Sequence, residues 1–188
     1  LGFPRLRNFP PSYLIVGSIL FAAYELCLSL SLGFAANRAQ AIELGIVNYL
    51  WPCFTVILAM VINGQRAGLL VAPGILLSVC GIVWVVSGAD GFSLERTLAN
   101  VSSNPLSYGL AFSGAVIWAV YCNVTKRFAD GKNGVVPFFM LTAAVLWIKY
   151  LFSAEPALAF TAPATLELAL PGAAMAARDP LWNVGILR

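Results

Sequence analysis

Residues 41–62 read AIELGIVNYLWPCFTVILAMVI, a run long and apolar enough to cross a bilayer as a helix. Near its centre stand Asn48, Tyr49, Trp51 and Pro52, none of which an apolar anchor needs. Pro52 has no N–H, so the carbonyl of Asn48, four residues earlier, loses its helical partner. The stretch predicts an interrupted membrane helix that presents an amide and a backbone acceptor at one depth. A simple proline kink, satisfied by a neighbouring Ser or Thr, is the competing interpretation.

The composition places the whole chain in the membrane. Of its 188 residues 60% are apolar and 10% charged, with a mean hydropathy of +0.86, whereas a soluble domain is about 25% charged. We therefore predict an all-α fold, a polytopic transmembrane helix bundle. Windows of about 20 apolar residues predict six spans, at 13–36, 41–62, 69–88, 105–125, 135–152 and 164–187, the last irregular. Because the chain starts at Leu1 and stops directly after an apolar segment, we expect a fragment of a larger bundle.

Several chemistries are absent from the sequence. It has no histidine and no GxxxxGK motif, which removes imidazole catalysis, histidine metal sites and P-loop ATP hydrolysis. The four cysteines, Cys27, Cys53, Cys80 and Cys122, fall inside predicted spans without metal-ligand spacing, and we expect buried thiols. We expect no metal and no cofactor.

Loop charge predicts the orientation. Loops on the side of the chain's start hold six Lys and Arg, and the alternate loops hold three. Positive charge near short loops marks the cytoplasm, so we expect a cytoplasmic N-terminus. The polar stretch 89–104 on the other side is interpreted either as a short surface helix, with Leu94, Leu98 and Val101 on one side, or as a plain linker.

Polar residues inside spans share faces, and such faces are expected to point into the bundle. In the first span Ser18, Ala22, Glu25 and Ser29 recur at helical spacing with Tyr24 beside them. Equivalent faces in the second and fourth spans comprise Leu44, Asn48, Trp51, Pro52 and Thr55, and Ser107, Ala111, Gly114, Trp118, Tyr121, Cys122 and Thr125.

The third span differs, since the side that carries Gly74, Ser78 and Gly81 has no ionisable residue. This pattern favours helix–helix packing over chemistry.

Five segments together resemble one transporter family: YELCLSLSL at 24–32, NYLWP at 48–52, PLSY at 105–108, WAVYC at 118–122 and WNVGIL at 182–187. They are similar to the YddG-type aromatic amino acid exporters of the drug/metabolite transporter superfamily, whose paired units are often called EamA domains. The resemblance implies ten helices in two inverted five-helix halves in a bacterial inner membrane. Residues 1–104 would end the first half and residues 105–188 would begin the second.

The resemblance also implies a central cavity lined by the spans that hold Tyr24, Tyr49, Trp51, Trp118 and Asn183. One stretch departs from the family pattern, because Arg178-Asp179-Pro180 stands where small and aromatic residues are expected. Either this is a local irregularity of the sequence or the sixth span is broken there.

The predicted function is export of aromatic amino acids by alternating access. Its partners would be the substrate, the lipid bilayer and the helices that the chain lacks, with no nucleic acid. Aromatic rings stack on indole and phenol faces or on cations, while Asn48 and its carbonyl suit an ammonium group. Glu25 is a candidate for holding a proton or that ammonium, and equally for a structural acid. The predicted substrate-binding residues are Tyr24, Glu25, Asn48, Tyr49, Trp51, Pro52, Trp118, Tyr121 and Asn183.

Two other functions compete with this one. A broader proton-driven drug or metabolite efflux carrier fits the same faces; a nucleotide-sugar carrier would need an arginine-lined cavity, for which Arg178 is the mid-span candidate. An intramembrane enzyme using Glu25 and Glu43 is disfavoured, because these carboxylates fall on different helices and no catalytic motif accompanies them.

Overall fold

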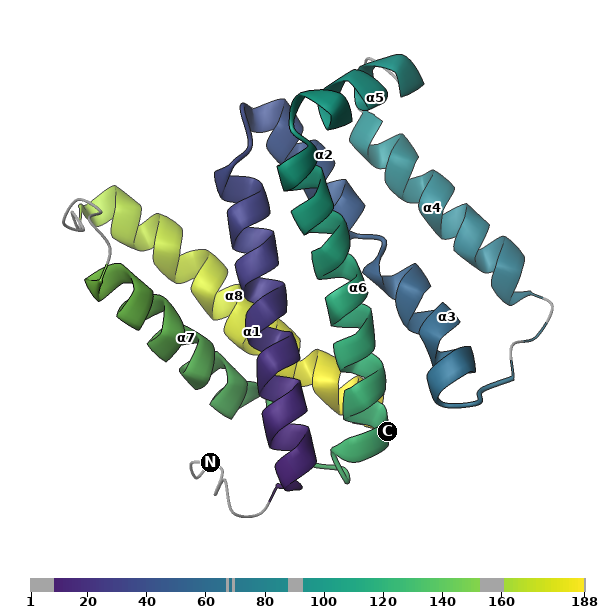
Figure 1. The fold of residues 1–188 in the computed structure, drawn as a ribbon, viewed down its shortest axis with the longest axis vertical. Helices are drawn as coiled ribbons and strands as arrows, with labels where there is room; N and C mark the ends of the chain where they lie inside the picture. The colour runs from purple at the N-terminus through teal and green to yellow at the C-terminus, as the bar shows by residue number, and fades with distance from the viewer. Residues whose placement is uncertain (1–8, 67, 69, 88–92, 153–160, 188) are drawn as a thin grey trace. The chain divides into compact units, whose positions relative to one another are not determined.

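The computed structural model describes residues 9–66, 68, 70–87, 93–152 and 161–187, and each regular element among them is an α-helix. The helices are α1 (Pro11–Gly33), α2 (Arg38–Asn48), α3 (Trp51–Ile62), α4 (Val71–Ser87), α5 (Leu94–Ser103), α6 (Pro105–Phe128), α7 (Val135–Leu151) and α8 (Ala162–Leu187) (Figure 1). The predicted all-α fold is confirmed.

The second predicted span is interrupted, as the sequence predicts. Helix α2 ends at Asn48, and the N–H groups of Tyr49 and Leu50 bond back to Gly45 and Val47. Helix α3 then starts at Trp51, with Pro52 in its first turn. A proline is favourable there because the first N–H groups of a helix have no intrahelical acceptor. The span is therefore two helices with a break between them, rather than one kinked helix (Figure 1).

Three segments among the described residues are long and apolar enough to cross a membrane: Pro11–Gly33, Arg38–Ile62 and Pro105–Phe128. The third and fifth predicted spans correspond to shorter apolar helices, Val71–Gly81 within α4 and Val135–Leu151. Helix α8 has 26 residues but is less apolar, since it carries Glu167, Arg178 and Asp179.

The chain divides into two compact units, one within residues 1–22 and 124–188 and the other within residues 23–123. This division differs from the predicted boundary at residue 104, and the assignment of EamA-like halves stays a prediction. Each unit is described below by itself.

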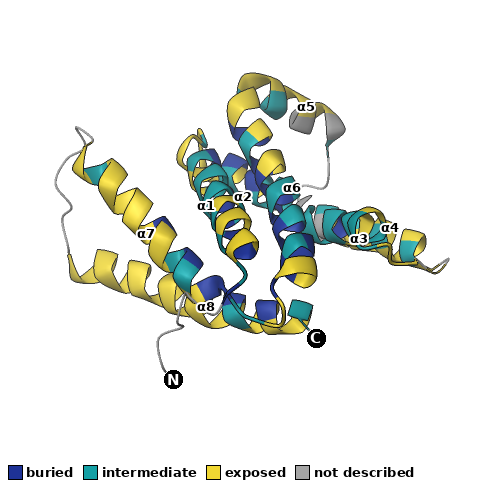
Figure 2. Ribbon diagram, turned by 60° about the horizontal axis from the view of Figure 1, so that its bottom comes forward, coloured by how far each residue is buried: buried dark blue, intermediate teal, exposed yellow. Residues whose placement is uncertain are grey.

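The polar face predicted on α6 is its buried face, as Figure 2 shows by the dark blue along one side of this helix. All of its predicted members are buried: Ser107, Ala111, Gly114, Trp118, Tyr121, Cys122 and Thr125. The regular spacing of small and aromatic side chains was therefore sufficient to identify the packed side of this helix.

The face predicted on α1 is not the buried face of this helix among the described residues. Ser29 is exposed, and Ser18 and Glu25 are only half-buried. The buried stripe lies to one side of it and runs along Tyr13, Gly17, Phe21, Tyr24 and Ser31. The aromatic side chains determine which stripe of α1 is buried, because large rings bury more apolar area than the Ser and Ala side chains of the predicted face.

Helix α5 confirms the surface-helix interpretation for residues 94–103, while residues 89–92 lie outside the described residues. Its Asn100 donates to both carboxylate oxygens of Glu43 on α2, each at 2.9 Å, and Tyr108 of α6 donates to the same carboxylate. Val101 packs on a small core that includes Leu44 and Tyr108. These contacts hold α2, α5 and α6 together at this end of the unit.

The unit within residues 1–22 and 124–188 is built around Phe138 of α7. Its ring lies 5.4 Å from the ring of Tyr13 and 5.9 Å from that of Phe21, both on α1. A Cβ added at Gly17 would lie 2.7 Å from the tip of this ring, and one at Gly134 would lie 2.8 Å from it. The two glycines thus leave the space that Phe138 occupies.

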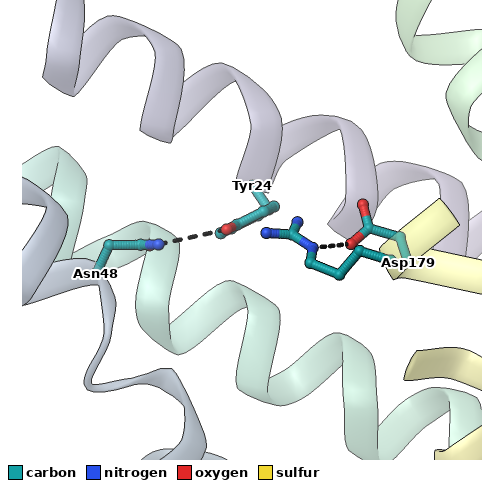
Figure 3. Close-up of polar contacts among 4 residues, drawn as sticks. Tyr24, Asn48 and Asp179 are labelled. Atoms are coloured by element: carbon teal, nitrogen blue, oxygen red, sulfur yellow. Dashed lines mark hydrogen bonds and ion pairs between the residues drawn. The ribbon is translucent and has the colours of Figure 1, made fainter. Parts of the chain in front are cut away.

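The predicted alternative of a break at Arg178-Asp179-Pro180 is wrong, since α8 continues through these residues. Pro180 has no N–H to donate to the carbonyl of Ala176, four residues earlier. The carbonyl of Pro180 itself accepts from the side chain of Asn133 at 3.0 Å. The buried Asp179 pairs with Nε of Arg178 at 2.6 Å (Figure 3). The ion pair and the amide contact both lie where the helix passes through the irregular sequence.

Among the described residues, the side of α4 that was predicted to pack against another helix is exposed. Gly74, Ser78 and Gly81 are all exposed, and a Cβ at either glycine would meet nothing within 4 Å. The expectation of four buried thiols is also wrong in part, because Cys80 of α4 is exposed and Cys27 is only half-buried. Helix α4 contacts α2 and α3, and other positions along it face outward.

Candidate functional site

Four predicted site residues, Tyr24, Trp51, Trp118 and Tyr121, form an aromatic cluster in the unit within residues 23–123. The ring of Trp118 lies 4.4 Å from that of Tyr24 and 4.9 Å from that of Tyr121, both at shallow interplanar angles. Trp51 meets Trp118 edge-on at 6.4 Å. Trp118 is thus the centre of the cluster, with rings from α1 and α3 beside it.

Asn48, the last residue of α2, lies against this cluster. Its Nδ2 donates to the hydroxyl of Tyr24 at 3.3 Å (Figure 3). Its Oδ1 is buried and has no hydrogen-bond partner among the described residues. A buried acceptor without a donor is costly and uncommon, so this oxygen is a candidate for meeting a ligand.

The break in the second span places these groups together. Asn48 ends α2 and Trp51 begins α3, so an amide and an indole lie on either side of two non-helical residues. The Thr55 hydroxyl donates to the carbonyl of Trp51 at 2.7 Å and supports the first turn of α3. The interruption between the two helices was predicted from the position of Pro52.

Asn123 of α6 holds α3 beside the cluster, and sequence reasoning missed it. Its Nδ2 donates to the carbonyl of Thr55 at 3.1 Å and to that of Ala119 at 2.9 Å. Its Oδ1 accepts from Asn63, the C-cap of α3, at 2.7 Å. The available signal was an amide inside an otherwise apolar helix, which usually marks a contact between helices.

The remaining predicted site residues lie in different surroundings. Pro52 is half-buried in the first turn of α3, and Glu25 is half-buried on α1. Tyr49 is 58% exposed. Asn183 is buried in the other unit, where its Nδ2 donates to Asn133 at 3.1 Å. The structure therefore brings five of the nine predicted residues together.

The two carboxylates of the enzyme alternative are held differently. Glu43 accepts hydrogen bonds from Asn100 and Tyr108 and joins three helices, which is a structural role. Glu25 lies on α1, and the Ser18 hydroxyl of the same helix donates to the carbonyl of Leu14. The described residues contain no group of three or more His, Cys, Asp or Glu that could hold a metal.

The side chains of this candidate site suit a flat aromatic group. Ring faces favour offset stacking and edge contacts with other rings, worth about 0.5–1.5 kcal/mol a pair beyond area burial. An amide oxygen beside the rings adds one directional acceptor. The fold and these contacts together define an all-α membrane protein whose interrupted helix lies against a cluster of aromatic side chains.

Comparison with known proteins identifies relatives of this membrane protein. The chain is 47% identical over 187 residues to the protein named Aromatic amino acid exporter YddG of Salmonella typhimurium and 46% identical to its namesake in Escherichia coli K12. Both matches cover the whole chain and 64% of the relative's length. A third protein of that name, from Ancylobacter novellus, is 32% identical over 115 residues, covering 60% of this chain and 37% of the relative.

The chain is therefore similar over its whole length to two proteins named aromatic amino acid exporter YddG, which confirms the resemblance found in the sequence. No protein-family model and no solved structure matches it. The chain spans less than two thirds of the first two relatives.

Proposed function

We propose that the protein containing this chain exports aromatic amino acids across a bacterial inner membrane. Two independent lines support this: the names of its relatives, and the cluster of Tyr24, Trp51 and Trp118 beside the interrupted helix. The cluster carries the proposal, because stacked rings recognise the side-chain class that the relatives' names specify. The lysine and arginine count supports a cytoplasmic N-terminus of the chain.

The binding step follows from the ring geometry. The closest pair, Tyr24 with Trp118, has centroids 4.4 Å apart, which leaves no room for a third ring between them. Trp51 makes the wider contact with Trp118, at 6.4 Å. A substrate ring would enter between Trp51 and Trp118. The edge contact between these two indoles would then be replaced by contacts of each indole with the substrate ring.

Alternating access would use the break between α2 and α3. The residues at the break, Tyr49 and Leu50, lie outside both helices, so α3 can tilt without breaking hydrogen bonds inside either helix. Trp51, at the start of α3, would move with it. A substrate contact with Trp51 would in this way be linked to the position of the helix.

The decisive test is efflux of labelled phenylalanine from cells that express the full-length gene product. Trp51→Ala removes the entry contact, and we expect efflux at low substrate concentration to fall about 2- to 10-fold, which corresponds to one aromatic pair. Trp84→Ala on α4 is the matched control, since this tryptophan is 83% exposed. Membrane abundance is measured for each variant.

Three results are informative. Loss of efflux in Trp51→Ala at normal abundance, with Trp84→Ala unchanged, supports the proposal. Equal efflux in wild type and Trp51→Ala would mean that Trp51 packs against its neighbours and does not contact the substrate. Competition of phenylalanine efflux by flat cationic dyes as strong as that by tryptophan would instead favour a broad efflux carrier.

A further inference from the structure

The start of α6 is tied by hydrogen bonds to α1 and to α2. Asn104, the residue before α6, donates to the carbonyl of Phe34 at 2.8 Å and to Oε1 of Gln40 on α2 at 3.0 Å. The carbonyl of Ser107 on α6 accepts from the hydroxyl of Ser31 on α1 at 2.9 Å. These bonds lie at the end of the unit where α5 also lies (Figure 1).

The Glu43 carboxylate makes a second connection between α2 and α6. It accepts from Tyr108 of α6 and from Asn100 of α5, so three helices meet at one side chain. Together with the contact between Gln40 and Asn104 it forms a polar group at this end of the unit. We call this group the clasp, and its members are Gln40, Glu43, Asn100, Asn104 and Tyr108.

An apolar layer lies between the clasp and the aromatic cluster. Leu44 and Ala111 are fully buried and pack with Tyr108. Leu44 comes four residues before Asn48 on α2, and Ala111 comes seven residues before Trp118 on α6. The layer is therefore about 6–10 Å from the cluster along the helix axes, on the side of the clasp.

The chemistry of the clasp suits a contact that opens and closes. Hydrogen bonds between helices in membrane proteins are individually weak, and two such side-chain contacts join α2 to the start of α6. Glu43, Asn100 and Asn104 are half-buried, so water can replace their partners when the helices separate. Opening would thus exchange bonds within the protein for bonds to water and leave no buried charge without a partner.

We propose that the clasp and the layer of Leu44, Tyr108 and Ala111 form the outer gate of the exporter, which opens when the substrate leaves. This rests on the proposed export and on the proposed cytoplasmic N-terminus, from which α1 crosses to the side where α2 and α6 begin. Glu43 is then a positioning residue that holds the gate closed through Asn100 and Tyr108. Each half of the interrupted span would serve one side of the membrane, α2 the outer side and α3 the inner side.

The first test holds the gate closed in the full-length protein. Gln40→Cys and Asn104→Cys replace two side chains in contact, and a short bifunctional methanethiosulfonate reagent links the two thiols. We expect linking to reduce phenylalanine efflux to the level of cells that lack the gene, while phenylalanine binding to the purified protein in nanodiscs stays unchanged. Reduction of the link should restore efflux, and treatment should not change the efflux of either single-cysteine variant.

The second test opens the gate. Cys27 of α1 lies beside Gly114, on the cluster side of the layer, and reports access from outside. In a Cys80→Ala background, which removes the exposed thiol, Glu43→Leu should speed labelling of Cys27 by an external, membrane-impermeant thiol reagent about 3- to 8-fold, the equivalent of one or two hydrogen bonds between helices. Glu43→Gln keeps an acceptor oxygen and should label more slowly than Glu43→Leu. Glu95→Leu, at an exposed acid of α5, is the matched control and should label like the wild type.

Other outcomes overturn the gate. Efflux that continues unchanged after linking would mean that this end stays closed during transport. Loss of binding together with efflux would mean that the clasp belongs to the substrate site. If the wild type exports no phenylalanine but labelling of Cys27 still responds to Glu43→Leu, the gate stands and the proposed substrate is wrong. If neither export nor this response is observed, both proposals fail.

Discussion

The amide of Asn123 should couple the stability of the α3–α6 contact to transport. Asn123→Leu keeps the size of the side chain and removes its hydrogen bonds. Two of these join the helices: the bond from Asn63 Nδ2 at 2.7 Å and the bond to the Thr55 carbonyl at 3.1 Å. The third, to Ala119, lies within α6 and does not hold α3.

The size of the effect follows from these two bonds. Hydrogen bonds between helices in membrane proteins average about 0.6 kcal/mol each, with a maximum of about 1.7 kcal/mol. Losing both therefore predicts a decrease of about 1–3 kcal/mol in the free energy of unfolding. Asn63→Ala removes one bond and leaves the Thr55 contact, so it should cost about half as much.

The assay is unfolding of the purified full-length protein by denaturing detergent in mixed micelles, followed by phenylalanine efflux at matched abundance. Asn123→Leu should lower both stability and efflux, because α3 carries Trp51 into the aromatic cluster. A change in stability within about 0.3 kcal/mol of zero, the usual error of additivity, together with normal efflux, would refute the idea that this amide holds α3. Equal losses in Asn123→Leu and Asn63→Ala would show that the Thr55 bond contributes nothing.

Two further predictions concern the packing around Phe138 and the loop before α7. Gly17→Ala should destabilise the protein by about 1–3 kcal/mol through overpacking, since its Cβ would lie 2.7 Å from Phe138. Thermal unfolding of Phe138→Leu and of the double variant checks this, and additive losses would contradict it. Asn133→Ala should cost about 1–3 kcal/mol, because Asn133 donates to the carbonyl of Pro180 and accepts from Asn183 and from the first N–H of α7. Hydrogen exchange at the start of α7 should become faster, and unchanged exchange would argue against this anchor.

The central features of the candidate site could be predicted from local sequence. Pro52 cannot donate a backbone hydrogen bond, whatever surrounds it, so an interruption near Asn48 follows from covalent chemistry. The inward face of α6 could also be predicted, because its small and aromatic residues recur at helical spacing from Ser107 to Thr125. Both predictions need only the period of one helix.

The face of α1 could not be predicted in the same way. Two stripes lie side by side on it, one with Ser18 and Glu25 and one with Gly17 and Tyr24, and the mean polarity of a stripe does not show which one meets another helix. The partners decide: Phe138 fits only over a glycine, and Trp118 stacks on Tyr24. These contacts depend on residues about 90–120 positions away in the chain.

The sequence by itself therefore determined that this is an all-α membrane protein with an interrupted helix and aromatic side chains near the break. Those properties depend on hydropathy, helical period and the missing N–H of one proline. Only the tertiary structure decided that Asn123 anchors α3, that α8 continues through Pro180, and that Gly114 lies against the side chain of Asn48. The physical reason is that hydrogen-bond partners and empty volume arise between helices, whereas local sequence encodes the preferences of one helix at a time.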